Sequence, residues 1–327
     1  IETSPPVKKA TSHRVRQSFG SMLIARPLSA LAGLSILVLL SRSLPSTAYG
    51  IYFAVWAMAE IIILASNFGL LNAAYRYVHA DERQSGLIVP YGPVWRLILL
   101  RVLSLVVGIG ILFIASFPLD KFIELKTVSI NVSAILALIV IGEGMARFVE
   151  VNMDSMLCQG RSQASLVSRT LLRFLGIAYL AVVKDLSIES VMIVEVIAIW
   201  IGLLISLMLL GDIYRRANQD KAVFEQHEQV STRRMIQYAF PAFVAQVLTL
   251  VYGADALKLV LSNVSGAEAL AVFGFAYSLS AVIQRYIPAN LLAGIFRPVF
   301  VAASKRPDAD TVLPDLLGLS IKNKWLI

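Results

Sequence analysis

Four charged residues interrupt one of the most apolar stretches of this chain. The segment IVIGEGMARFVEVNMDSML, residues 139–157, carries Glu143, Arg147, Glu150 and Asp154. Carboxylates and guanidinium groups can form ion pairs, bind charged ligands or carry protons, and each role is costly in a nonpolar environment. The spacing of four, three and four residues places all of them on one narrow face of a helix. The segment therefore predicts a charged stripe along an otherwise apolar helix.

A second charged face lies on the next apolar stretch, where Arg169 and Arg173 are four residues apart. If the two helices run antiparallel, we expect Asp154 to lie level with Arg169 and Glu150 with Arg173. The predicted cluster contains equal numbers of acids and arginines, namely Glu143, Arg147, Glu150, Asp154, Arg169 and Arg173. A site for an anionic ligand would keep a positive surplus, so the neutral sum favours an ionic clasp between two helices. The alternative is a stripe that moves or carries protons.

The elements that carry these charges are expected to be membrane-spanning helices. Of the 327 residues, 57% are hydrophobic and 15% are charged, against about 25% charged in typical soluble domains. Runs of about 20 apolar residues can cross the hydrocarbon core as helix. The sequence contains eight such runs, at 22–40, 50–71, 95–116, 133–157, 165–183, 188–210, 235–261 and 268–295. The predicted fold class is an all-α, polytopic membrane protein.

The basic residues of the loops predict the orientation. Most loop lysines and arginines fall on the side of the N-terminus, and the other side holds only Arg42, Lys121, Lys126 and Lys184. Cytoplasmic loops are enriched in Lys and Arg, so we expect a multi-pass protein with a cytoplasmic N-terminus. This topology also accounts for most of the net charge of +8. Nucleic acid is therefore not an expected partner.

The chain divides into two predicted lobes. We expect an N-terminal transmembrane lobe of six helices over 1–210, a cytoplasmic linker over 211–233, and the start of a C-terminal transmembrane lobe over 234–327. A ninth apolar run is too short to span, so the second lobe is expected to be truncated. The second span of each lobe carries a Phe-Ala pair, at Phe53 and Phe275, and such repeats are common in secondary transporters.

Several other charges lie inside the predicted spans, and some have simple structural interpretations. Arg26 and Arg101 lie near helix ends, so their long side chains could reach the lipid headgroups. Asp255 and Lys258 are three residues apart and could form a local ion pair. Glu60 lacks an opposite charge within reach on its own helix, as does Arg285. A functional role is therefore favoured for those two.

An enzymatic or metal-binding role is not expected. A single cysteine, Cys158, excludes an intrachain disulfide and a multi-cysteine metal site. The three histidines, His13, His79 and His227, lie outside the predicted spans, and no nucleophile–base set is visible. The sequence therefore predicts no cofactor and no metal site.

Five segments together resemble a known family of membrane proteins. They are LSRSLPSTAYGIYFAVWAMAE, FGLLNAAYRYV, QYAFPAFVAQ, YGADALKLVL and GFAYSLSAVIQRYIPANLLAGIFRPVF. The motifs within them are Arg42 followed by Tyr49 and Gly50, Pro241 near the start of the seventh span, and Asp255 in its middle. Through most of its length the chain is similar to bacterial polysaccharide (Wzx-type, O-antigen and exopolysaccharide) flippases. These belong to the multidrug/oligosaccharidyl-lipid/polysaccharide exporter superfamily.

The resemblance implies a two-lobe bundle that moves undecaprenyl-pyrophosphate-linked oligosaccharide across the bacterial cytoplasmic (inner) membrane by alternating access. It implies lipid-linked oligosaccharide and membrane lipids as partners, with polysaccharide polymerase and export machinery as further ones. In this family the first, second, seventh and eighth spans line the cavity. The resemblance thus suggests Arg26, Lys258 and Arg285 as anion contacts. Glu60 and Asp255 are then candidates for coupling to H⁺ or Na⁺.

Three other functions remain open from the sequence. A drug/cation antiporter of the same superfamily would favour an acidic, aromatic cavity, whereas the predicted cavity has more cations than acids. A lipid II flippase would share the same fold. A membrane scaffold for a polysaccharide synthase would not transport at all, and it would tolerate the loss of cavity charges.

Overall fold

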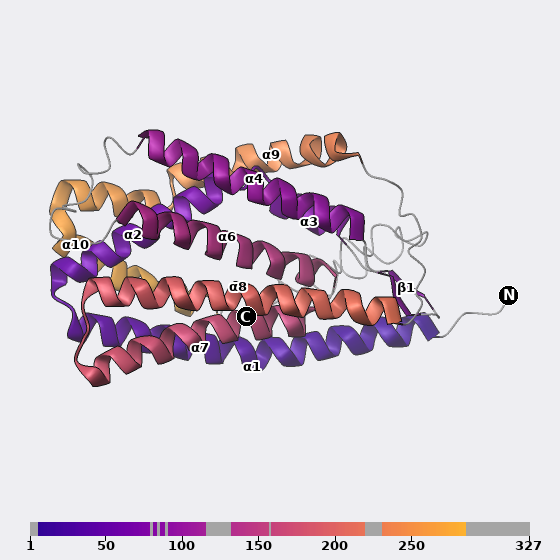
Figure 1. Ribbon diagram of the computed structural model, residues 1–327, viewed down its shortest axis with the longest axis horizontal. Helices are drawn as coiled ribbons and strands as arrows, with labels where there is room; N and C mark the ends of the chain where they lie inside the picture. The colour runs from indigo at the N-terminus through magenta and orange to yellow at the C-terminus, as the bar shows by residue number, and fades with distance from the viewer. Residues whose placement is uncertain are drawn as a thin grey trace, which may run out of the picture.

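Long helices form nearly all of the structure that is described. The computed structural model describes residues 6–78, 81–83, 86–88, 91–115, 132–156, 158–219 and 231–285. The helices, shown in Figure 1, are α1 (Pro6–Ser43), α2 (Ser46–Ala65), α3 (Leu70–Tyr77), α4 (Tyr91–Ala115), α6 (Val132–Ser155), α7 (Gln159–Val183), α8 (Ile188–Gln219), α9 (Thr232–Val251) and α10 (Ala254–Arg285). Strands β1 (Asp81–Arg83) and β2 (Gly86–Ile88) pair as a short antiparallel ribbon. The predicted all-α fold class is confirmed.

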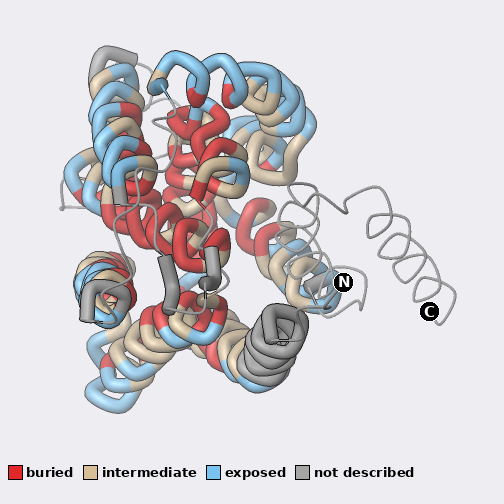
Figure 2. Tube along the Cα trace, turned by 90° about the vertical axis from the view of Figure 1, so that its right-hand side faces the viewer, coloured by how far each residue is buried: buried red, intermediate tan, exposed pale blue. Residues whose placement is uncertain are grey.

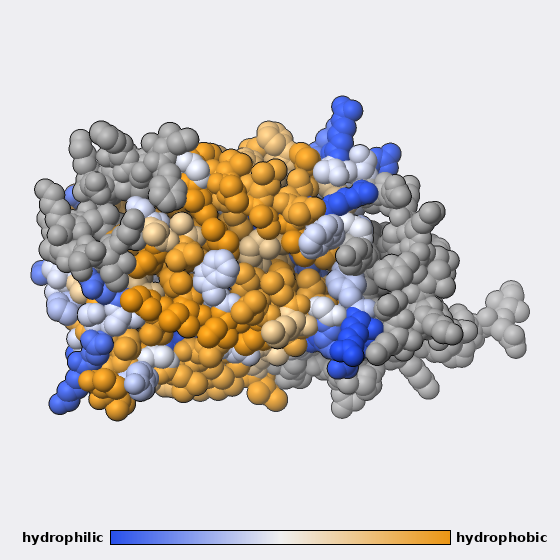
Figure 3. All heavy atoms as spheres, in the orientation of Figure 1, coloured by the Kyte–Doolittle hydropathy of each residue, from blue (hydrophilic) through white to orange (hydrophobic). Residues whose placement is uncertain are grey.

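The helices are those of a polytopic membrane protein. Within the described ranges, seven helical stretches are long and apolar enough to cross a membrane. The first six predicted runs each coincide with one stretch, and the runs 235–261 and 268–295 share the last, Thr232–Gln284. Figure 3 shows hydrophobic surface across the middle of this face and hydrophilic residues toward both ends. Such an apolar belt is expected of a surface that contacts lipid.

The second predicted run, 50–71, is interrupted by a turn. Helix α2 starts after Pro45, whose fixed φ and missing N–H suit the beginning of a helix. It ends at Ala65, because Phe68 and Gly69 adopt positive φ angles of 45° and 73°, which a right-handed helix cannot include. The short helix α3 then continues the chain.

The predicted run 235–261 is also broken, in the middle of its apolar sequence. Helix α9 ends at Val251 and α10 begins at Ala254. Between them, Gly253 donates its backbone N–H to the carbonyl of Leu250, which closes a tight turn. The seventh predicted span is therefore two helical pieces rather than one.

Helix α10 itself folds back on Gly266. This residue has φ 81° and ψ 175°, a conformation that is essentially restricted to glycine. The ammonium group of Lys258 lies 5.0 Å from the centre of the Tyr277 ring. On a straight helix these residues would be about 28 Å apart. Helix α10 thus consists of two antiparallel legs, 254–265 and 267–285.

Helix α2 occupies the interior of the bundle. It contacts α10, α6, α9, α4, α8 and α1, and its apolar window is the most buried of the candidate spans, at 61%. Figure 2 shows buried residues on the sides of helices that face one another and exposed residues on the outer sides. The main apolar core includes α2 residues together with residues of α1, α6, α7, α8 and α10.

The predicted division into two lobes stays a prediction. The first lobe denotes α1 to α8, and the second-lobe helices are α9 and α10. Helix α8 continues to Gln219, so the first part of the predicted linker 211–233 is helical. The remainder, 220–230, lies outside the described residues, as do the ninth apolar run and the side chain of Arg285.

Candidate functional site

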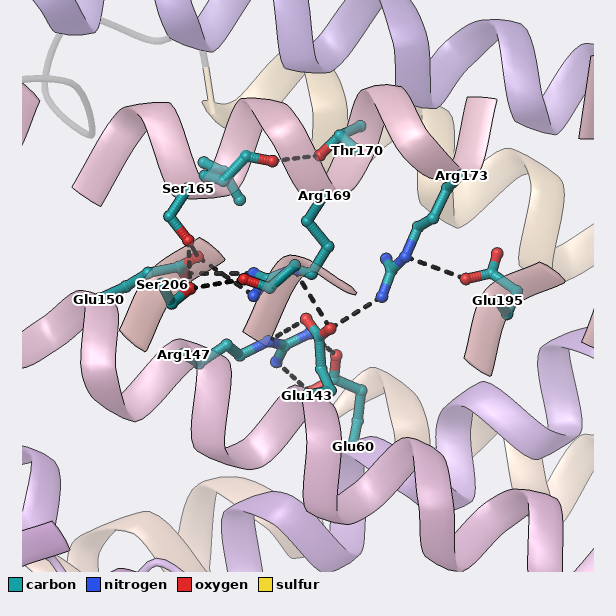
Figure 4. A network of polar contacts seen from close by, with 12 residues as sticks. Glu60, Glu143, Arg147, Glu150, Ser165, Arg169, Thr170, Arg173, Glu195 and Ser206 are labelled. Carbon is teal, nitrogen blue, oxygen red and sulfur yellow. Dashed lines mark hydrogen bonds and ion pairs between the residues drawn. The ribbon is translucent and has the colours of Figure 1, made fainter. Parts of the chain in front are cut away.

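Ion pairs join α6 and α7 along the predicted charged stripes. Arg147 lies 2.7 Å from Glu143 one turn earlier on α6. Across the helix boundary, Arg169 lies 3.1 Å from Glu150, and Arg173 lies 2.8 Å from Glu143. Figure 4 shows these side chains pointing toward one another from the two helices. The structure therefore brings together five of the six residues of the predicted clasp.

The pairing register differs from the predicted one by about one helical turn. The prediction placed Asp154 level with Arg169 and Glu150 level with Arg173, and both pairings are wrong. The expected span began at residue 165, whereas α7 already begins at Gln159. The shorter connection brings each α6 residue level with a residue earlier in α7, so Arg169 meets Glu150.

Asp154 lies at the edge of the cluster rather than within it. It interacts with Ser162 and, electrostatically, with the like-charged Glu150 and with Arg26 of α1. One of its carboxylate oxygens is buried and has no hydrogen-bond partner among the described residues. The charged stripe of α6 thus divides into a paired section and a separate end.

Two further glutamates extend the cluster to α2 and α8. Glu60 of α2 accepts two hydrogen bonds from Arg147, at 2.5 and 2.7 Å. Glu195 of α8 lies 3.0 Å from Arg173 and accepts a hydrogen bond from Tyr52 at 3.0 Å. Glu60 pairs with a residue of α6, which is consistent with the absence of an opposite charge within its reach on α2. Glu195 was missed, although it lies inside the apolar run 188–210, six residues beyond Glu189 at the start of that run.

The predicted charge balance also changes. The paired cluster contains four carboxylates and three guanidinium groups, from Glu60, Glu143, Glu150, Glu195, Arg147, Arg169 and Arg173. A fourth arginine, Arg101 of α4, acts on Arg147 electrostatically from nearby. The side chain of Arg101 is 2% exposed and donates to the Ile63 carbonyl at 3.1 Å. The interpretation in which it could reach the headgroups is therefore wrong.

Small residues make room for this cluster. A side chain at Gly202 of α8 would press against the Arg169 side chain, with its Cβ 2.9 Å from the Arg169 Cβ. Ser165 donates a hydrogen bond to Glu150 at 2.8 Å and also contacts Ser206 of α8. Trp56 of α2 lies with its ring 4.7 Å from the Arg173 guanidinium, a favourable cation–π arrangement. The charged side chains are therefore surrounded by a glycine that leaves space for them, by serine hydroxyl groups and by an aromatic ring.

The charges of the second-lobe helices form a separate pair. The Lys258 ammonium lies 2.8 Å from the Asp255 carboxylate, as expected for residues three apart on a helix. The ring of Tyr277 covers the same ammonium group from the other leg of α10. The predicted anion contact and the predicted coupling residue thus neutralise each other here.

Arg26 and Lys258 lie at different depths in the bundle. Arg26 is about 25 Å from the C-terminal end of α1, and Lys258 is about 12 Å from Gly266. Gly266 lies beside the α1–α2 turn, because Ser46 hydrogen-bonds Glu268 at 3.4 Å. The two cations are therefore roughly 13 Å apart along the helix axes. The two proposed anion contacts are therefore offset along the bundle in this conformation.

In the described part of the chain, no group of three or more His, Cys, Asp or Glu residues is placed so that it could hold a metal ion. The fold and the buried ionic cluster are those of a multi-span membrane protein with polar groups inside its helical bundle. A family model described as polysaccharide biosynthesis protein matches residues 15–301. The chain belongs to this family. No curated protein and no solved structure matches the chain.

Proposed function

We propose that the protein is a flippase for undecaprenyl-pyrophosphate-linked oligosaccharide. It would move this lipid from the inner to the outer leaflet of the bacterial cytoplasmic membrane, with its N-terminus in the cytoplasm, for surface polysaccharide synthesis. The observation that carries the proposal is the match to the polysaccharide biosynthesis family over residues 15–301 of a multi-span helical chain. A saccharide that is made on one side of the membrane and used on the other has to be moved across it.

The physical chemistry of the substrate supports a protein route. A pyrophosphate and a sugar chain cannot cross about 30 Å of hydrocarbon unaided. Polar groups between the lobes would replace water around the headgroup, and the lipid tail would stay in the bilayer. Transport needs no covalent chemistry, so no catalytic residue is assigned.

Lys258, Arg26 and Arg285 are the proposed anion contacts. Lys258 is buried and pairs with Asp255 in this conformation, so a phosphate would compete with this carboxylate for the ammonium group. Since Arg26 lies at another depth, we propose that it contacts the headgroup at a different stage of the transport cycle. Charge-assisted contacts of this kind stabilise a phosphate by about 1.5–3 kcal/mol.

Charge-removing variants in a host that lacks the gene test these contacts. Lys258→Gln and Arg26→Gln are each expected to lower surface polysaccharide about tenfold, because each removes a contact to the phosphates. Lys184→Gln is the matched control, because Lys184 is exposed at the end of α7. If both site variants keep wild-type polysaccharide levels, the proposed anion contacts are wrong.

A further inference from the structure

One face of α2 contacts the charged cluster along most of the helix. Tyr52, Trp56 and Glu60 are spaced by four residues, which places them on one face. Their partners come from three other helices and are, in order, Glu195, Arg173 and Arg147. Figure 4 shows Glu60 approaching Arg147 from below the cluster. The first lobe therefore holds α2 through polar contacts at three successive turns.

A different face of α2 contacts the second-lobe helix α10. A methyl group at Gly50 would overlap the carbonyl oxygen of Ala267. A Cβ at Gly274 would lie 2.5 Å from the Phe53 ring. Gly50 and Phe53 are rotated about 90° from the face that meets the cluster. The glycines let the two backbones approach closely, so any movement of α2 displaces the surface that α10 contacts.

The C-terminal end of α2 likewise contacts a first-lobe residue on one side and second-lobe residues on the other. On the first-lobe side, Arg101 donates to the Ile63 carbonyl in the last turn of α2. Cations favour this end of a helix because its carbonyls carry partial negative charge. On the other side, Asn67 donates to Gln246 of α9 at 3.0 Å, and Gly69 lies against the Ala239 carbonyl of α9. Helix α2 thus contacts both second-lobe helices while arginines of the first lobe hold it.

The Glu60–Arg147 pair is the accessible part of this arrangement. Their side chains are 23% and 38% exposed, whereas the side chain of Arg169 is 2% exposed. Breaking a partly exposed pair costs less free energy than breaking a fully buried one, so this pair is the part of the cluster that can open most readily. We propose that α2 transmits changes in the charged cluster to the contact between the lobes, with Glu60 and Arg147 as positioning residues.

This inference rests on the proposed function, since it assumes that the lobes move during transport. A cation such as H⁺ or Na⁺ at Glu60 would compete with Arg147 for the carboxylate. Loss of the Glu60–Arg147 ion pair would then remove one of the contacts that position α2 and would change the contact between α2 and α10. Coupling through α2 would in this way link ion binding to movement of the lobes.

Thiol cross-linking measures the contact between the lobes directly. In a Cys158→Ser background, one protein carries Ser46→Cys with Glu268→Cys, and a second carries Asn67→Cys with Gln246→Cys. The first pair reports the N-terminal end of α2 and the second pair reports its C-terminal end. Adding Glu60→Gln is expected to change the ratio of cross-linking rates at the two ends by about fivefold or more. Measurements use the full chain in native membranes with a short bifunctional thiol reagent.

The Arg161–Asp212 pair provides the matched control. It joins α7 to α8 without involving α2, at 2.7 Å and with side chains 26% and 37% exposed. Asp212→Asn should leave the cross-linking ratio unchanged. Glu60→Asp keeps a carboxylate for Arg147 and should hold the ratio closer to the wild-type value than Glu60→Gln does, which a general loss of stability would not do.

The outcomes separate this inference from the proposed function. An unchanged ratio in Glu60→Gln would overturn coupling through α2, whether or not the protein flips lipid. A changed ratio in Glu60→Gln, together with a wild-type protein that flips no lipid-linked saccharide, would support the coupling and overturn the proposed function. If Glu60→Gln does not accumulate in membranes, Trp56→Leu tests the same face by removing the ring beside Arg173, and an unchanged ratio there would also overturn the proposal.

Discussion

Arg169 has a guanidinium group that lies between two glutamates of α6, 3.1 Å from Glu150 and 3.4 Å from Glu143. Replacing it by methionine would leave buried carboxylates with one fewer cation. We expect Arg169→Met to lower the free energy of unfolding by about 3–5 kcal/mol. The midpoint of thermal unfolding of the detergent-purified protein measures this loss.

Two further variants make the Arg169 measurement specific. Arg169→Met combined with Glu150→Met should recover much of the loss, because no carboxylate of Glu150 then remains unpaired. Arg216→Met removes the exposed partner of Asp212 and should cost about 0–1 kcal/mol. Equal midpoints for Arg169→Met and Arg216→Met would contradict the importance of the buried cluster.

The residue types of the cluster could be predicted from the sequence, but its partners could not. Helical spacing alone identified the α6 and α7 stripes, because residues on one face recur every three or four positions. The pairing of Arg169 with Glu150 depends on where α7 begins, which spacing within a helix does not determine. The joining of Glu60 and Glu195 depends on which helices become neighbours in the bundle.

At the scale of single helices, the close approach of α2 to α10 depends on glycine. Gly50→Ala would place a methyl group on the Ala267 carbonyl oxygen and force the two helices apart. Overpacking of this kind is expected to lower the free energy of unfolding by about 1–3 kcal/mol. Thermal unfolding and the cross-linking of Ser46→Cys with Glu268→Cys both report the change.

Gly33→Ala is the control for this substitution. Gly33 lies in helix α1 with no heavy atom within 4 Å of an added Cβ, and alanine favours a helix over glycine by about 0.5–1 kcal/mol. The control should therefore be neutral or stabilising. A Gly50→Ala protein that is as stable as Gly33→Ala would contradict a close backbone contact between α2 and α10.

The helices could be predicted well from apolar runs, whereas their interruptions could not. Long runs of apolar residues predict spans because the bilayer requires them. The break between Val251 and Ala254 falls inside such a run, where hydropathy carries no signal. The positive φ angles at Phe68 and Gly266 likewise depend on local backbone geometry and on neighbouring helices.

At the scale of the whole molecule, the second helix of the first lobe packs against the second leg of α10. These are the two segments that carry the Phe-Ala pairs at Phe53 and Phe275, from which two related lobes were predicted. Their contact agrees with a pairing of equivalent helices between lobes, and the boundaries of the lobes stay a prediction. Any movement of one lobe relative to the other would therefore have to change the contact between α2 and α10.

The leaflet distribution of lipid-linked saccharide tests the flippase proposal most directly. The gene is deleted in its host, lipid-linked saccharides are extracted, and a membrane-impermeant probe separates those of the inner leaflet from those of the outer. If the protein is this flippase, complete repeat units accumulate on the cytoplasmic face while surface polysaccharide falls, and the wild-type gene reverses both changes. A deletion strain in which no lipid-linked saccharide accumulates would contradict the proposed substrate.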